Sequence, residues 1–177
     1  MQPITTPRLR LRLLEQADSV FYLRLINDKS FIENIRDKGI RTVDGAWDDI
    51  QKGPLESQKL RGFSMYLVEL AENATPLGLC GLVKRETLPD ADLGYAFMPK
   101  FAGKGYAHEA AIAVLELAFQ QLNLTKLAAI TTPDNLASNK LLQKLGFKIE
   151  RVGSIGEDTE ILNIYALYAS DYLAQQV

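Results

Sequence analysis

The chain has 177 residues, of which 47% are hydrophobic and 24% charged, and a formal net charge of −2. These values predict one globular domain over residues 1–177 and exclude the basic footprint of a nucleic-acid-binding protein. No apolar run approaches the roughly 18 residues of a membrane span, and a single cysteine with no signal peptide favours a cytoplasmic location.

The N-terminal third predicts a strand, a helix and a polar segment. Residues 8–13 alternate arginine with leucine, which predicts a strand with one solvated arginine face. Residues 15–27 carry apolar side chains at helical spacing. Residues 28–61 are polar and punctuated by glycine, and they predict one or two short helices, chiefly around residues 43–51.

The middle of the chain predicts strands followed by a long helix. Two apolar runs, residues 63–70 and 77–84, are separated by a turn and predict a hairpin. Residues 93–98 predict a third strand. Residues 104–121 predict the longest helix, because alanine, valine and leucine recur there at helical spacing. Residues 127–131 then predict a short buried strand.

The C-terminal part predicts one more helix and two closing strands. Asp134 or Asn135 is expected to cap a helix that ends at Gly146. Residues 147–152 and 160–168 read as strands. The order of elements predicts an α/β fold of the α+β kind, with a mixed, mostly antiparallel sheet flanked by helices. The long helix makes the strands on either side of it parallel neighbours, if they pair.

A glycine-bearing loop, residues 100–105, leads into the long helix. Gly103 and Gly105 allow backbone conformations closed to other residues, and the amides that begin the helix lack partners. Together with the helix dipole they predict a phosphate cradle. The Walker spacing is absent, and the dinucleotide fingerprint has His108 in place of its third glycine.

A third pattern fits this loop better. Arg/Gln-x-x-Gly-x-Gly/Ala at the start of a helix is the pyrophosphate loop of the GNAT (Gcn5-related) N-acetyltransferases, and the loop resembles it with Lys100 at the first position. Other blocks resemble the RimJ/RimL-like branch, which acetylates the N-termini of ribosomal proteins. They are TPRLRLR at 6–12, DLGYAF at 92–97, TPDNLASN at 132–139 and KLGF at 144–147. The resemblance runs from about residue 5 to about residue 170.

The resemblance implies acetyl-CoA as cosubstrate and a splayed pair of parallel strands that holds its pantetheine arm. It implies that Asn135 contacts the pantetheine, that Ser138 lies near the sulfur, and that Asn139 and Lys144 meet the nucleotide end. The residues expected to bind the cofactor are Phe97, Met98, Lys100, Ala102, Gly103, Lys104, Gly105, Tyr106, Asn135 and Asn139. No metal site is expected, because the chain has one histidine and one cysteine.

Acetyl transfer needs a neutral amine, a stabilised oxyanion and a leaving thiolate. Backbone amides at Phe97 and Met98 are expected to stabilise the oxyanion. Asp92 is the first candidate for the base, since several members of the family have Glu there, and Glu86 is its rival. For either carboxylate, a solvated turn residue is the alternative.

The acid that protonates the leaving group in the family is a tyrosine five residues before the Phe of Gly-Phe, and Leu142 stands there. Ser138 is too weak an acid to do more than relay a proton. Tyr165 and Tyr168 are further candidates without an assigned place. His108 is expected at the surface. Phe31 and Trp47 either anchor the core or form a wall of the substrate site.

The sequence therefore predicts an acetyl-CoA-dependent N-acetyltransferase with Ser138 and Asp92 as catalytic residues. Its expected acceptor is a primary amine, either a peptide or protein N-terminus or a small molecule, and the expected state is a monomer or homodimer. The alternative is a CoA-binding or sensing module with the same fold and little turnover.

Overall fold

The computed structural model describes residues 2–157 and 159–174 of the chain. Within them, eight strands form one sheet in the order β1-β2-β3-β4-β5-β6-β8-β7. The strands are β1 Ile4–Thr5, β2 Leu9–Arg12, β3 Met65–Leu70, β4 Pro76–Val83, β5 Asp92–Phe97, β6 Lys126–Thr131, β7 Lys148–Gly153 and β8 Leu162–Tyr168. Neighbouring strands are antiparallel except β5 and β6, which are parallel. The predicted mixed, mostly antiparallel sheet is confirmed.

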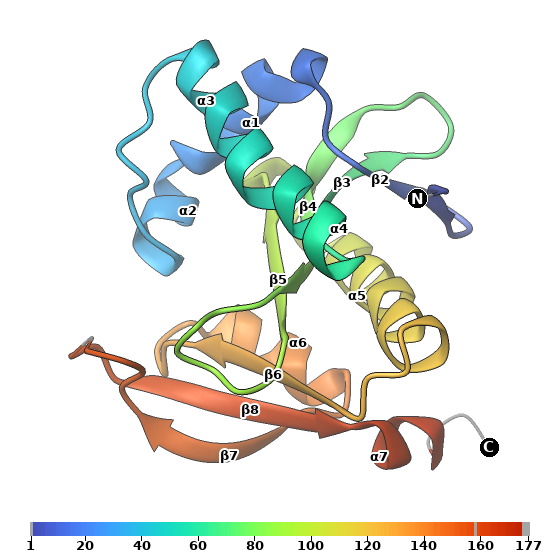
Figure 1. Cartoon of the computed structure of the whole chain (residues 1–177), viewed down its shortest axis with the longest axis vertical. Helices are drawn as coiled ribbons and strands as arrows, with labels where there is room; N and C mark the ends of the chain where they lie inside the picture. The colour runs from blue at the N-terminus through green and yellow to red at the C-terminus, as the bar shows by residue number, and fades with distance from the viewer. Residues whose placement is uncertain (1, 158, 175–177) are drawn as a thin grey trace.

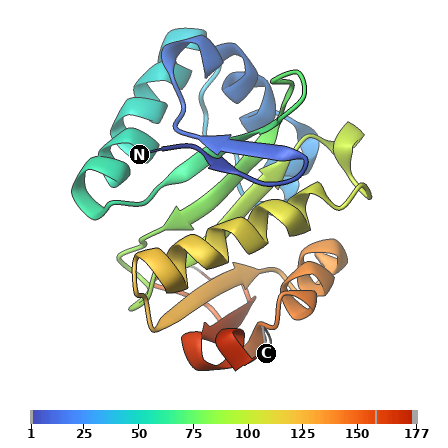
Figure 2. The same cartoon turned by 90° about the vertical axis from the view of Figure 1, so that its right-hand side faces the viewer.

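Helices cover both faces of this sheet (Figures 1 and 2). The α-helices are α1 Ser19–Ile26, α2 Lys29–Asn34, α3 Val43–Ile50, α4 Glu56–Arg61, α5 Tyr106–Glu116, α6 Leu136–Lys144 and α7 Ala169–Ala174. Short helical turns complete them: η1 Gln16–Asp18, η2 Gln51–Leu55, η3 Pro99–Phe101 and η4 Leu117–Gln121. Helices α5 and α6 lie on one face, and α1 and α3 lie on the other (Figure 2).

Two apolar clusters follow from this layering. The larger one joins the sheet to α5 and α6, and includes Val114 of α5, Leu142 of α6 and Tyr66 of β3. The smaller one joins the opposite face to α1 and α3. Cys80 of β4 lies in the larger cluster, fully buried in the ladder between Tyr66 and Tyr95. Burial raises the pKa of its thiol.

The segment 28–61 is more helical than the sequence predicts. After α2, one continuous helical stretch runs from α3 through η2 to α4, although it contains Pro54. Proline lacks an N–H, and the π-helical turn at residues 51–55 accommodates it without ending the helix. Phe31 and Trp47 pack against the smaller apolar cluster, which fits the core-anchoring alternative.

The arginine face of β2 is exposed at Arg8 and Arg10, as predicted, but its arginines are ion-paired and Arg12 is half-buried. Arg10 and Arg12 both pair with Glu69 of β3, whose side chain is 1% exposed, and Arg12 also pairs with Asp18 at 2.7 Å. A carboxylate this buried requires cationic partners, and β2 lies next to β3 in register with it.

The other predicted elements appear with shifts of one to a few residues. Helix α6 begins after Asn135, whose side chain accepts a hydrogen bond from the Ser138 N–H, and the chain turns at Gly146 with φ +91°. Strands β7 and β8 close the sheet as predicted. The short β1 and α7 lie outside the sequence-based predictions.

Candidate active site

Strands β5 and β6 pair at a single register, Asp92 opposite Ala128. There the Ala128 N–H donates to the Ala91 carbonyl at 2.9 Å. No later residues of the two strands pair, so the sheet opens toward their C-terminal ends. The loop that contains the glycines follows β5, and α6 follows β6, so both come after the C-terminal ends of the two strands.

The backbone of β5 turns the Phe97 amide toward the gap. The Met98 N–H donates to the Leu77 carbonyl of β4 at 2.9 Å, and the Met98 carbonyl accepts from the Phe101 N–H. Successive residues of a strand point these groups to opposite neighbours. The Phe97 amide therefore points toward the gap, while the Met98 amide does not. Of the two residues expected to supply an oxyanion donor, the geometry fits only Phe97.

The glycine loop is open to solvent. Gly103 and Gly105 have φ angles of +75° and +81°, which favour glycine, and both residues are exposed. A Cβ added at Gly103 would meet no protein atom within 4 Å. The first amides of α5 have no intrahelical partner, and Gly105, the N-cap of α5, supplies no side chain to accept from them. The Ala102 amide, in contrast, donates to the Pro99 carbonyl.

Basic side chains flank this loop. The ammonium groups of Lys100 and Lys104 lie 4.8 and 5.8 Å from the centre of the Phe101 ring. Arg8 braces the loop from the β2 side: it donates to the Lys104 carbonyl at 3.0 Å and lies 4.7 Å from the Tyr106 ring centre. The exposed amides and lysines suit a pyrophosphate.

Glu109 of α5 holds Arg8 in this position. It accepts the Arg8 Nε–H at 2.6 Å and the Thr6 hydroxyl at 2.6 Å. Burial alone would raise the pKa of Glu109, but these hydrogen bonds outweigh burial and lower it. The carboxylate therefore stays charged and keeps the brace formed.

The first turn of α6 faces the gap. Asn135 uses its side-chain oxygen for the helix cap. The Asn139 side chain is 8% exposed and bonds inside the protein at both ends. Its amide donates to the carbonyls of Thr132 and Asn135, and its oxygen accepts from Tyr165 at 2.7 Å. Asn139 thereby fixes the β6–α6 loop to β8, and its expected contact with the cofactor remains a prediction.

Ser138 has a partner that the sequence did not single out. The Tyr95 hydroxyl lies 2.8 Å from Ser138 Oγ and 3.4 Å from the Ser138 carbonyl oxygen. Tyr95 points to the α5–α6 face with Leu93 and Phe97. Burial raises the pKa of Tyr95 to about 12, against a smaller opposing effect of the bond to Ser138. The alternation of side chains along β5 predicts which face of the sheet Tyr95 lies on. Nothing in the sequence identifies its partner on α6.

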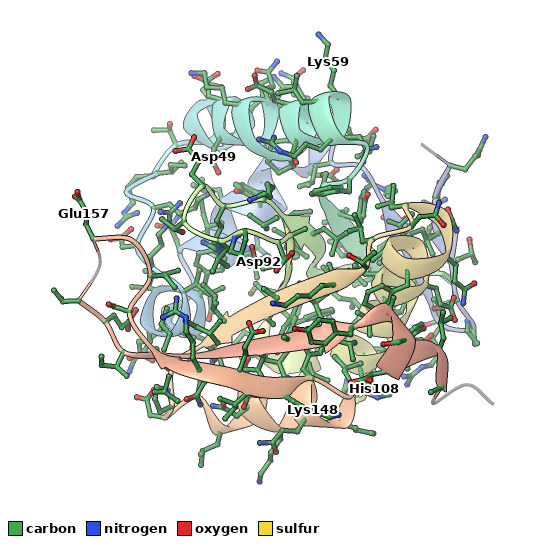
Figure 3. All side chains as sticks on the ribbon, turned by 60° about the horizontal axis from the view of Figure 1, so that its bottom comes forward. Asp49, Lys59, Asp92, His108, Lys148 and Glu157 are labelled. Carbon is green, nitrogen blue, oxygen red and sulfur yellow. The ribbon has the colours of Figure 1, made fainter. Side chains whose placement is uncertain are left out.

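Asp92 lies on the opposite face, with Gly94 and Met65. It is 1% exposed, and its Oδ2 accepts from Arg85 Nε at 3.1 Å, while Oδ1 has no hydrogen-bond partner among the described residues. Burial raises the pKa of Asp92, and the Arg85 charge opposes the rise in part. Figure 3 places Asp92 in the interior, beneath the β4–β5 loop.

The other candidates lie outside β5 and the first turn of α6. Glu86 is exposed in the β4–β5 loop. Leu142 is buried in the larger apolar cluster. Tyr165 donates to Asn139, and Tyr168 to Glu150 at 3.3 Å.

His108 is partly exposed near the start of α5. Partial burial, and to a lesser degree the charge of Lys144, lowers its pKa. Among residues 2–157 and 159–174, no three potential metal ligands cluster, and no helix could cross a membrane.

Known proteins share this architecture. A family model described as the acetyltransferase (GNAT) domain matches residues 8–148. The N-acetyltransferase p20 of Bacillus licheniformis is 32% identical over 155 residues, which cover 85% of this chain and 84% of p20.

Two solved structures resemble the whole fold. An acetyltransferase from Agrobacterium tumefaciens is 25% identical, with a TM-score of 0.81 over 95% of each chain. RimL, a ribosomal L7/L12 alpha-N-protein acetyltransferase solved with coenzyme A, is 18% identical, with a TM-score of 0.81 over 94% of this chain and 98% of RimL. The chain thus belongs to the GNAT family and is an acetyl-CoA-dependent N-acetyltransferase.

Proposed function

We propose that this enzyme acetylates the α-amino group of a peptide or protein N-terminus. The observation that carries the proposal is the gap between β5 and β6, which has a glycine loop at one end and carboxylate and hydroxyl groups on its two faces. Acetyl-CoA supplies the activated acetyl group as a thioester.

The chain's own groups fit this cosubstrate. The open space at Gly103, the free amides that begin α5, and the ammonium groups of Lys100 and Lys104 suit the pyrophosphate. The Phe97 amide suits the carbonyl oxygen of the thioester, since it points into the gap. Asn135 keeps its side-chain N–H₂ for the pantetheine, because the cap uses its oxygen alone.

The two groups that handle protons lie on opposite faces of the sheet beside the gap. Asp92 lies on the α1–α3 face and Ser138, with Tyr95, on the α5–α6 face. Along β5 the three-residue offset between Asp92 and Tyr95 is roughly 10 Å. An amine that enters from the Asp92 side can attack while the sulfur leaves toward Ser138. Asp92 then acts as the base through a chain of water molecules, since it lies roughly 16 Å along β5 from the Phe97 amide. Its burial suits a proton acceptor with a raised pKa.

Proton availability favours an α-amine over a lysine side chain. An α-amine with a pKa of about 7.7–8.0 is neutral in on the order of a tenth of molecules at pH 7, and a lysine with a pKa near 10.4 in about four of ten thousand. A site whose base is one carboxylate, Asp92, partly neutralised by Arg85, acts more readily on the α-amine than on lysine. The likeness to RimL, described as an alpha-N-protein acetyltransferase, is consistent with this choice.

Paired peptides test the acceptor. One has a free N-terminus and no lysine, and the other has a blocked N-terminus and one lysine. We expect acetyl transfer from acetyl-CoA to the first to be at least tenfold faster. A faster reaction of the blocked peptide would contradict the proposal, as would rates on spermidine or an aminoglycoside far above both, which would support the alternative of a small-molecule acceptor.

A further inference from the structure

Ser138 is held at two points, its backbone N–H and its side-chain oxygen. Asn135 accepts its backbone N–H at 3.1 Å, which fixes the first turn of α6. Tyr95 meets its side-chain oxygen at 2.8 Å from across the gap, 43 residues away along the chain. Within the described part of the chain, Tyr95 is the group that bonds the Ser138 hydroxyl.

The direction of this bond decides what Ser138 can do. A serine hydroxyl has one proton and two acceptor sites. If Ser138 donates to Tyr95, its proton is occupied. If Tyr95 donates to Ser138, the Ser138 proton is free for a third group. Tyr95 stays protonated at neutral pH and can act as the donor, and its other acceptor, the Ser138 carbonyl oxygen, is farther away at 3.4 Å.

We propose that Tyr95 is a positioning residue that donates its hydroxyl proton to Ser138 Oγ and so turns the Ser138 O–H toward the leaving sulfur. The inference rests on the proposed use of the β5–β6 gap for acetyl-CoA. It also gives a physical answer to the absence of a tyrosine at Leu142. The hydroxyl comes from β5 instead of from α6, and it acts through serine.

The step balances without transfer of the tyrosine proton. The amine nitrogen forms the bond to the acetyl carbon and loses one proton, which a chain of water molecules carries to Asp92. The carbon–sulfur bond breaks and its electron pair stays on sulfur, where the Ser138 O–H stabilises the thiolate by a hydrogen bond. Water protonates the thiolate on release, and Asp92 returns its proton to solvent. A charge-assisted hydrogen bond of this kind changes a rate roughly 10- to 100-fold.

The test compares Tyr95→Phe, Ser138→Ala and the double variant with the parent. We expect each single change to lower kcat roughly 10- to 100-fold with little change in KM for acetyl-CoA. The double variant should be no slower than the slower single variant, because both remove one hydrogen bond to sulfur. Tyr66→Phe is the matched control. It removes a buried hydroxyl from the same row of the sheet, bonded to Gln58, and should leave kcat within twofold.

A binding measurement separates positioning from loss of structure. Free CoA carries the thiol, and desulfo-CoA lacks it. In the parent, the affinity for CoA relative to desulfo-CoA should rise with pH as the bound thiol ionises. Both Tyr95→Phe and Ser138→Ala should lose this rise while binding desulfo-CoA normally. A Tyr95→Phe enzyme with parental kcat and a parental pH dependence would overturn the inference. Failure of the parent to bind CoA would overturn the proposed site instead.

Discussion

At the scale of single residues, Asp92 combines a buried carboxylate, one cationic partner and an unpaired oxygen. If it is the base, activity requires its carboxylate form. Because burial raises its pKa, the rate should rise with pH through a value above that of an ordinary aspartate, about 3.9. Asp92→Asn should lower kcat at least tenfold and remove this acid limb from the pH–rate profile. Glu86→Gln, in the exposed loop, is the control, and a larger loss there would transfer the role of base to Glu86.

The same carboxyl group gives a stability prediction with a definite sign. A raised pKa means that the folded state holds the proton more tightly than the unfolded chain. The Asp92 contribution to the free energy of unfolding therefore falls as pH rises from the ordinary value through the folded pKa. Asp92→Asn should flatten the pH dependence of denaturant unfolding in that window. An unchanged profile would mean that Arg85 already cancels the effect of burial.

Alanine substitutions at Gly103 and Gly62 distinguish the effect of backbone strain from exclusion of the ligand. Gly103→Ala places a Cβ at φ +75°, and Gly62→Ala places one at φ +77°, in each case with no protein atom within 4 Å. A non-glycine residue in this conformation costs roughly 1–2 kcal/mol, so both variants should lose similar stability. Only Gly103→Ala should also lose CoA affinity, by at least tenfold in calorimetry. Equal affinities in the two variants would move the pyrophosphate away from this loop.

At the scale of elements, the start of α6 has two functions that substitutions can separate. Asn135→Ala removes the cap and should cost about 0.5–2 kcal/mol of stability. Asn135→Asp keeps an acceptor for the Ser138 N–H and should keep the stability. Both variants lose the side-chain amide donor, so both should bind CoA more weakly. If Asn135→Asp binds CoA as the parent does, Asn135 serves the helix alone.

The elements also show how far the sequence was informative. The α6 cap and the glycine loop follow from residues adjacent in the chain, such as Asn135 and Gly105, and these were predicted. The bond between Tyr95 and Ser138 depends on how two elements meet across the gap, and periodicity gives only the face of each. The same holds for Arg10 and Arg12, because nothing local shows that Glu69 lies beside them. Pro54 was misleading, since a π-helical turn accommodates it.

At the scale of the whole molecule, the strands β1–β5 and β6–β8 meet at one register only. A ligand in the gap touches both groups and should stabilise their junction. At 100 times its dissociation constant, CoA should add roughly 2.7 kcal/mol. Hydrogen exchange should therefore slow in β6 and α6 as well as in residues 100–108.

ADP is the control for this measurement, because it has the pyrophosphate without the pantetheine arm. It should slow exchange in residues 100–108 and leave β6 and α6 near their free rates. Protection by CoA that stays confined to the loop would contradict a pantetheine site between β5 and β6.

The burial of Cys80 has a practical consequence. It is the one cysteine of the chain, it is fully buried, and its thiol resists ionisation. The native enzyme should therefore not react with chromogenic disulfide reagents, which develop colour when they react with thiols. Each mole of chromophore released then corresponds to one mole of free CoA produced. Turnover can be followed continuously without a correction for the protein's own thiol. The same reagent becomes a probe of unfolding once denaturant exposes β4.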